Sequence, residues 1–365
     1  MSVPGQLRIH ALQNIVPRSL PARSPLGLDQ MAFGIGRRQF VCAFGGAVAV
    51  WPLVSRAQQP PIPIVGFLNH NNTPEAFAPS LAALRQGLSD KGYEDGRNVT
   101  IAVRYALGQA DRLPALADEL VRLNAAVLVA GGGFNAGSAI AEKMASATTP
   151  VIFLSAGDAV KGGLVAALNR PGGNFTGVVI LANELDAKRL ELLDQIVPKE
   201  APLSFFVDGH DAAVADDQAR AGAAAANALG RRLTVVRIAD EAEFEPAFAA
   251  MAARHDGGVA VGASAYFNSR RQQIVQLAAR YALPAVYEFR GFVSDGGLMS
   301  YGTDLSASYR LVGDYVARVL KGEKPADMPV QQATAFNLVI NLKAAKTLGL
   351  TLPLPLLGRA DEVIE

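Results

Sequence analysis

From Ile62 onward, short apolar runs alternate with longer amphipathic segments. The run Ile62–Leu68 has the length of a buried strand, and Asn98–Ala106 alternates apolar and polar residues as a half-exposed strand does. The segments Pro74–Lys91 and Asp111–Leu123 have the apolar spacing of helices. Strands that alternate with helices of about 12 to 18 residues predict a parallel sheet covered on both faces.

The same alternation starts again after Asn183. A helix is predicted over 184–198, and a second series of strands and helices follows it, with strands at 203–208, 233–239, 258–264, 284–289 and 297–302. The sequence therefore predicts two Rossmann-like α/β lobes joined by hinge crossovers. We expect one lobe to comprise 61–182 plus about 304–325, and the other 183–303 plus about 326–365.

Residues 1–57 are predicted to comprise an N-terminal extension and a cleaved export signal. Arg37 and Arg38 precede a mostly apolar run from Val41 to Val54, and Ser55-Arg56-Ala57 follows with small residues at both positions that a signal peptidase reads. The run is shorter than the roughly 20 residues needed to span a bilayer. The arginine pair resembles a twin-arginine signal, which favours export to the periplasm. Met31 is an alternative start.

The amino-acid composition argues against several classes of ligand and site. The 365 residues carry a formal net charge of +1, and 18% of them are charged, so no bulk field favours nucleic acid or an anionic membrane. Cys42 is the single cysteine and lies within the predicted signal, so disulfides and thiolate metal sites are not expected. No metal motif and no cofactor are predicted.

The stretch "AGGGFNAGSAI", from Ala130 to Ile140, follows an apolar run and precedes a helical pattern. Gly131, Gly133 and Ala136 match the G-x-G-x-x-G/A pattern of dinucleotide-binding turns. However, the turn follows the third strand, and free NAD(P) is scarce outside the cytoplasm. Two alternatives remain: a tight turn with only a structural role, and a helix start whose N–H groups hold the carboxylate of a small ligand.

Residues just after the strand ends are the candidates for ligand contact, because ligands of open α/β sheets bind at the carboxyl ends of the strands. The candidates of the first lobe are Asn69, His70, Gly133, Phe134, Asn135, Ala156, Gly157 and Asp158. Those of the second lobe are Asp208, His210, Ser264, Tyr266, Tyr287, Glu288 and Phe289. Aromatic side chains suit a planar group, and carboxylates suit an ammonium group.

Several candidates also have a structural interpretation. Phe134 and Phe289 are equally typical of core residues, and Asp158 is typical of a helix cap. Ser264, His210 and Asp208 include the residue types of a hydrolase triad, but "VGASAY" lacks the second glycine of a G-x-S-x-G elbow. We therefore do not expect an enzyme.

Four stretches carry a resemblance to a known family. They are "GDAVKGGLVAALNRPGGNFTGV", "AKRLELLDQIVP", "FNSRRQQIVQLAARYALPAVYEFRGFVSDGGLMSYG" and "FNLVINLKAAKTLGLTLPLPLLGRADEVIE". They resemble the ABC-transporter substrate-binding family that includes tryptophan- and tyrosine-binding proteins, over about Pro61 to Glu365. The chain departs from the family at Phe134-Asn135, where members commonly have Thr-Pro, and at Asp158-Ala159, where they often have Asp-Pro.

The resemblance implies a type I periplasmic-binding-protein fold that closes over a small molecule between its lobes. It also implies a permease and an ATPase as partners, and we expect the protein itself to be a monomer. An amino acid or an aromatic carboxylate is the expected ligand. A sensory ligand-binding protein of the same fold remains an alternative, as does, more remotely, an NAD(P)-dependent enzyme.

Overall fold

The computed structural model describes residues 61–71, 73–131, 137–138, 140, 149–156, 158–180 and 185–365. The chain divides into two units, Met1–Gln59 and Pro60–Glu365, and all described residues belong to the second. The predicted export signal therefore lies outside the described residues. So do four of the ligand candidates, Gly133, Phe134, Asn135 and Gly157.

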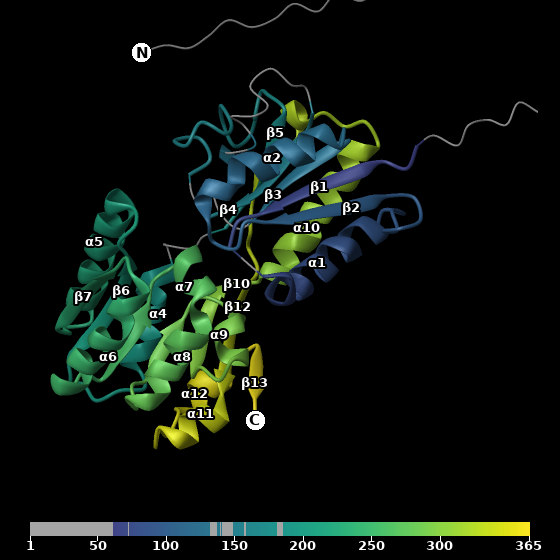
Figure 1. The fold of residues 1–365 in the computed structure, drawn as a ribbon. Helices are drawn as coiled ribbons and strands as arrows, with labels where there is room; N and C mark the ends of the chain where they lie inside the picture. The colour runs from purple at the N-terminus through teal and green to yellow at the C-terminus, as the bar shows by residue number, and fades with distance from the viewer. Residues whose placement is uncertain are drawn as a thin grey trace, which may run out of the picture. The chain divides into compact units, whose positions relative to one another are not determined.

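The first lobe is built on a parallel sheet with the strand order β11-β5-β4-β3-β1-β2 (Figure 1). Its strands are β1 (Ile64–Asn69), β2 (Thr100–Tyr105), β3 (Val127–Gly131), β4 (Val151–Ser155), β5 (Phe175–Val179) and β11 (Gln331–Gln332). In β1, β3 and β4 nearly every residue is buried. This is expected for central parallel strands with helices on both faces.

Alternate residues of these strands enter two different hydrophobic cores, one on each face of the sheet. On one face, the strands pack against α1 (Pro74–Ser89) and α10 (Leu305–Leu320). On the other face, they pack against α2 (Leu113–Arg122), which the 3₁₀ turn Ala110–Arg112 precedes. Because α10 comes from far along the chain, the first lobe is discontinuous in sequence.

Glycines allow α1 and α10 to approach closely. A Cβ on Gly87 would lie 2.0 Å from the carbonyl oxygen of Arg310, and one on Gly313 would lie 2.3 Å from the carbonyl oxygen of Leu84. Each clash would be with backbone, which cannot move aside as a flexible side chain can. The two helices therefore depend on glycine at both positions.

The second lobe is built on a sheet with the order β13-β12-β10-β9-β8-β6-β7. Its strands are β6 (Leu203–Asp208), β7 (Leu233–Ile238), β8 (Gly258–Val261), β9 (Ala285–Tyr287), β10 (Met299–Thr303), β12 (Phe336–Asn341) and β13 (Glu362–Ile364). All pairs are parallel except β10 with β12, which run antiparallel. The prediction of two α/β lobes built on parallel sheets is confirmed, apart from this one antiparallel pair.

Helices cover both faces of this sheet as well. One core holds residues of α4 (Asp186–Asp194), α5 (Ala212–Ala228), α11 (Leu342–Thr347) and α12 (Leu354–Leu357). The other holds residues of α6 (Phe244–Ala253), α7 (Ala265–Ser269), α8 (Arg271–Arg280) and α9 (Arg290–Ser294), with the 3₁₀ turn Glu241–Glu243 before α6. Because the helices lie on the two faces of the sheet, loops are found at the ends of the strands.

The late part of the chain crosses between the lobes at two described points, one near Asp304 and the other near Ala335. Asp304 caps α10 with its side chain, and its backbone N–H donates to the Ala335 carbonyl, so the two crossovers are hydrogen-bonded to each other. After the 3₁₀ turn Pro325–Asp327, the chain still follows the first sheet, because the N–H of Ala333 donates to Val179 at 2.8 Å. The return to the second lobe therefore comes later than the expected boundary near 326.

Candidate functional site

Three polar candidates meet at one edge of the second sheet. Strands β6, β8 and β9 are neighbours and run parallel, so their carboxyl ends lie together. Asp208 is the last residue of β6, Ser264 follows β8, and Glu288 follows β9. The rule that the sequence analysis applied thus brings these residues to the same edge.

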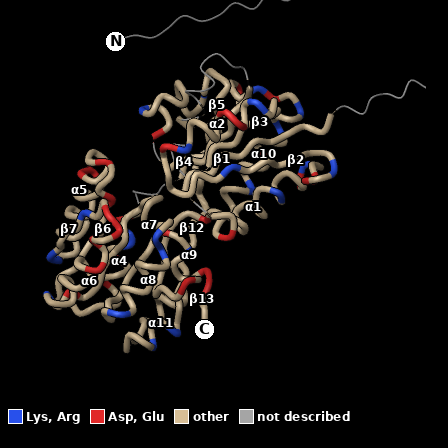
Figure 2. The backbone as a smooth tube through the Cα atoms, in the orientation of Figure 1, with Lys and Arg blue, Asp and Glu red and all other residues tan. Residues whose placement is uncertain are grey.

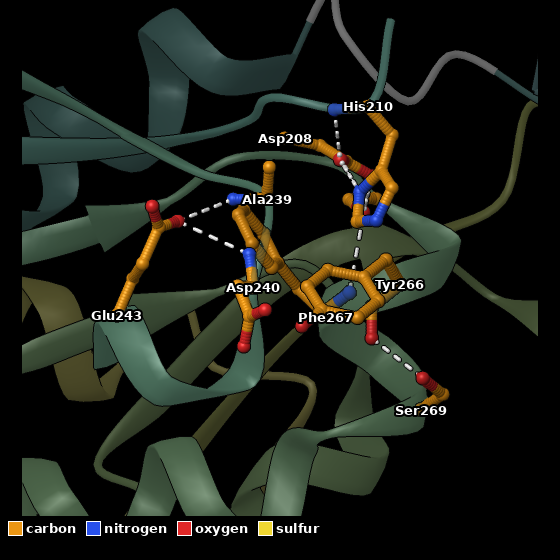
Figure 3. A network of polar contacts seen from close by, with 9 residues as sticks. Asp208, His210, Ala239, Asp240, Glu243, Tyr266, Phe267 and Ser269 are labelled. Carbon is orange, nitrogen blue, oxygen red and sulfur yellow. Dashed lines mark hydrogen bonds and ion pairs between the residues drawn. The ribbon is translucent and has the colours of Figure 1, made fainter. Parts of the chain in front are cut away.

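Asp208 is the centre of a network at this edge (Figure 3). The Ser264 hydroxyl donates to Asp208 Oδ2 at 2.6 Å, and the backbone N–H of His210 donates to Oδ1 at 3.0 Å. His210 Nδ1 lies 2.7 Å from the same Oδ1. The Asp208 side chain is 21% exposed, so the carboxylate is held in place but remains within reach of solvent.

This arrangement is not that of a serine-hydrolase relay. In such a relay the histidine lies between the serine and the aspartate and takes the serine proton. Here the aspartate lies in the middle, since both Ser264 and His210 contact Asp208. The geometry therefore suits a carboxylate that is presented to a ligand better than a serine that is activated for attack.

An aromatic side chain lies beside this carboxylate. Figure 3 shows the Tyr266 ring near His210, and the two ring centroids are 4.6 Å apart in an edge-to-face arrangement. The guanidinium of Arg270 lies 5.7 Å from the Tyr266 centroid, and partial burial raises the pKa of the Tyr266 phenol. A carboxylate near an aromatic ring is a suitable environment for a ligand that has both a cationic and a planar group.

A buried polar cluster lies behind the edge, and the sequence analysis did not identify it. Asp186 and Arg189 of α4 form an ion pair with both side chains fully buried. Gln218 of α5 donates to Asp186 Oδ2 at 3.1 Å, and Arg189 Nη1 donates to the Tyr301 carbonyl at 3.0 Å. Both residues of the ion pair occur in a helix with ordinary helical spacing, so no local signal marks them as buried.

Glu288 belongs to this buried cluster. It is 5% exposed, and burial raises the pKa of its carboxyl to about 7, against the opposing effect of the Arg189 charge. The backbone N–H of Ser264 lies near this carboxyl and also opposes the rise in its pKa. Burial likewise raises the pKa of Asp186, although Arg189 and three hydrogen bonds favour its charged form.

The two neighbours of Glu288 have different surroundings. Tyr287 is 1% exposed and stacks on Phe292, with centroids 4.7 Å apart, inside the core of the second lobe. Phe289 is half-buried and packs against the core. In this structure the Tyr287 side chain is closed to solvent, so ligand contact at Tyr287 and Phe289 stays a prediction.

In the first lobe, the described candidates lie at the carboxyl ends of β1 and β4. Asn69 and His70 are buried, and desolvation lowers the pKa of His70, which favours the neutral imidazole. Ala156 and Asp158 are exposed. Asp158 Oδ1 accepts the N–H groups of Val160 and Lys161, each at 3.0 Å, and the Lys161 N–H contributes most to the lowered pKa of Asp158. Asp158 therefore caps a turn, and not the start of a helix as one interpretation of the sequence expected.

One pocket, of about 280 Å³, is lined by residues of both lobes: Asn71, Thr73, Ala76, Glu241, Ser269, Arg270, Arg271, Gln272 and Gln273. None of the predicted ligand residues lines it, although Asn71 and Ser269 are close in sequence to His70 and Tyr266. Across the described residues, no group of histidine, cysteine, aspartate and glutamate has the arrangement of a metal site.

Charge and hydropathy add little to this picture. Figure 2 shows lysine and arginine interspersed with aspartate and glutamate along the elements of both lobes. Among the described helices, none has the length and apolar character that crossing a membrane requires.

Comparison with known proteins identifies relatives over nearly all of the described chain. Residues 62–364 match the family model described as ABC transporter substrate binding protein. A tyrosine-binding protein from Clostridioides difficile (strain R20291) is 25% identical over 276 residues, which cover 74% of this chain and 77% of that protein.

Solved structures agree with the fold. A domain from Streptococcus pneumoniae in complex with L-Trp has a TM-score of 0.72 at 24% identity, covering 83% of this chain and 99% of that one. A conserved domain protein from Vibrio cholerae has the same TM-score and coverage at 26% identity. These likenesses confirm the predicted fold, that of the type I periplasmic binding proteins.

Proposed function

The chain belongs to the ABC transporter substrate-binding protein family, and from that premise we propose that it is an extracytoplasmic receptor for an aromatic amino acid. It would bind this solute between its lobes, without altering it, and deliver it to a permease that an ATPase subunit drives. The match of residues 62–364 to the family model is the observation that carries the proposal. The tyrosine-binding relative supports the ligand class.

The edge of the second sheet offers groups that suit such a ligand. Asp208 accepts two hydrogen bonds from His210 and one from Ser264, and a carboxylate has about four acceptor positions, so an ammonium group can still bind. The Tyr266 ring next to His210 provides an apolar surface for a planar side chain. We assign the ammonium group to Asp208 and the planar group to Tyr266.

The first lobe would complete the site. His70 follows β1 at the carboxyl edge of that sheet, and its buried imidazole is where the ligand carboxylate would bind. Binding to groups of both lobes favours the closed state, because a ligand shifts a conformational equilibrium only by its difference in affinity for the two states.

Calorimetric titration of residues 61–365 with L-tyrosine and L-tryptophan tests the proposal. In Asp208→Asn the loss of a charge-assisted hydrogen bond, worth about 1.5–3 kcal/mol, is expected to weaken binding about 10- to 100-fold. Asp216→Asn is the matched control, because Asp216 is an exposed carboxylate of the same lobe that pairs with Arg237. Equal affinity of Asp208→Asn and the control would contradict the assignment of the ammonium site.

The export prediction needs its own test. The precursor, produced in a bacterial host, is expected to yield a periplasmic protein that begins after Ala57. An Arg37→Lys, Arg38→Lys variant is expected to remain in the cytoplasm if the twin-arginine route is used. Normal export of that variant would refute the route, and an uncleaved N-terminus would refute the signal.

A further inference from the structure

Three buried side chains lie on the inner side of the turn between β8 and α7. The Ala263 N–H donates to Asp186 Oδ1 at 3.3 Å, and the Ala263 carbonyl accepts from Gln218 Nε2 at 3.1 Å. The next N–H, that of Ser264, lies near the Glu288 carboxyl and opposes the rise in its pKa. Both hydrogen-bonding groups of Ala263 thus have side-chain partners, and the donor of Ser264 lies near a third buried side chain on another element.

The three side chains cannot themselves touch a ligand in this structure. Asp186, Gln218 and Glu288 have at most 5% of their surface exposed. The backbone groups of a turn at a sheet edge are ordinarily satisfied by water, at no desolvation cost to the protein. Burying two carboxyls and the Arg189 guanidinium for this purpose is costly, so the position of the turn needs a further reason.

The turn determines where Ser264 points its hydroxyl. Ser264 Oγ accepts the Phe267 N–H at 3.2 Å as the N-cap of α7, and its own proton goes to Asp208 Oδ2. Asp208 Oδ1 in turn accepts the backbone N–H of His210. A displacement of the turn would therefore be transmitted through Ser264 to the Asp208 carboxylate.

We propose that Asp186, Gln218 and Glu288 form a positioning frame that fixes the Ala263–Ser264 turn and, through Ser264, the Asp208 carboxylate for ligand binding. These are positioning residues: they act through Ser264 and do not contact the ligand. The claim that the frame serves ligand binding rests on the proposed function. The claim that it fixes Ser264 and Asp208 is independent of any ligand.

The backbone amides of Ser264 and His210 provide the test, because the Ser264 N–H lies near the Glu288 carboxyl and the His210 N–H donates to Asp208. Their ¹H–¹⁵N shifts and hydrogen exchange are measured in residues 61–365. Glu288→Met keeps the side-chain length but removes the acceptor, so we expect faster exchange at Ser264 and a shifted His210 resonance. Glu288→Gln retains an acceptor oxygen and is expected to restore both.

Two further variants keep the test decisive. Gln218→Met releases the Ala263 carbonyl without changing any charge, and replaces Glu288→Met if that variant does not fold. Ser204→Ala is the matched control: Ser204 donates to Asp256 at 2.7 Å in the same lobe, but near the opposite end of β6 from Asp208. The control is expected to lower stability and leave both amides unchanged.

Affinity for L-tyrosine and L-tryptophan then shows whether the frame serves binding. We expect Glu288→Met to lower the affinity about tenfold, the equivalent of about 1.4 kcal/mol, and Glu288→Gln to stay near wild type. In a Ser264→Ala background, Glu288→Met is expected to cause no additional loss, since the effect is transmitted through Ser264. Full additivity of the two losses would overturn the proposal.

The two proposals fail in different ways. If the amide shifts and exchange rates of Ser264 and His210 are unchanged in both Glu288→Met and Gln218→Met, the frame is refuted, whether or not a ligand binds. If these amide signals change but the affinity for the ligand does not, the role of the frame in binding is refuted. If the wild-type protein binds neither amino acid, the proposed ligand class is refuted, and the amide measurements still decide whether the frame positions Asp208.

Discussion

Replacing Glu288 by glutamine is expected to remove a large pH dependence of stability. The ordinary pKa of this carboxyl is 4.5, and burial raises it to about 7 in the folded protein. Between these values the folded state keeps a proton that the unfolded state releases, so the folded state binds more protons and stability falls as pH rises. At about 1.4 kcal/mol for each pKa unit, the free energy of unfolding of the wild type falls by about 3 kcal/mol over this range, whereas that of Glu288→Gln does not.

The assay is urea unfolding of both proteins at intervals from pH 4.5 to pH 8. The difference between the two free energies of unfolding isolates Glu288, because other titrating groups, including His70, contribute equally to both proteins. We expect the wild type to lose stability relative to Glu288→Gln through this window, mostly before pH 7. A constant difference across the window would refute the argument that burial controls this carboxyl.

Three other predictions concern single contacts, and urea unfolding measures each. Gly87→Ala is expected to cost about 1–3 kcal/mol, because its Cβ would meet the backbone of α10, whereas Gly173→Ala has open space and serves as its control. Asp304→Ala removes the N-cap of α10, at about 1 kcal/mol. Arg231→Met removes one of the two cations that pair with the buried Asp194 carboxylate, while Lys199 remains, and is expected to cost about 1–3 kcal/mol. Losses near zero would contradict the mechanism named in each case.

Much of the fold was accessible from the sequence. Buried parallel strands such as β3 and β4 are nearly continuous apolar runs, and caps such as Asp304 mark where helices begin. The short strand β11 was not predicted, because two glutamines have no strand pattern and pair with β5 only through tertiary context. For the same reason the crossover near Ala333 was expected too early.

The candidate site was accessible in part. The rule for strand ends identified Asp208 and Ser264, which contact each other, because parallel neighbours share an edge. It also selected Glu288, although this residue is buried, with 5% of its surface exposed. Asp186, Arg189 and Gln218 were missed, because their burial depends on how α4 and α5 pack on the sheet. A charged residue in a helix gives no sign of this packing in the sequence.

The most direct test of the account is the calorimetric titration of residues 61–365 with L-tyrosine and L-tryptophan, alongside a simple sugar and NAD. The account predicts saturable binding of an aromatic amino acid, with weaker binding in Asp208→Asn and no conversion of the ligand. Binding of NAD alone would contradict it, and would instead favour the dinucleotide interpretation of the "AGGGFNAGSAI" turn.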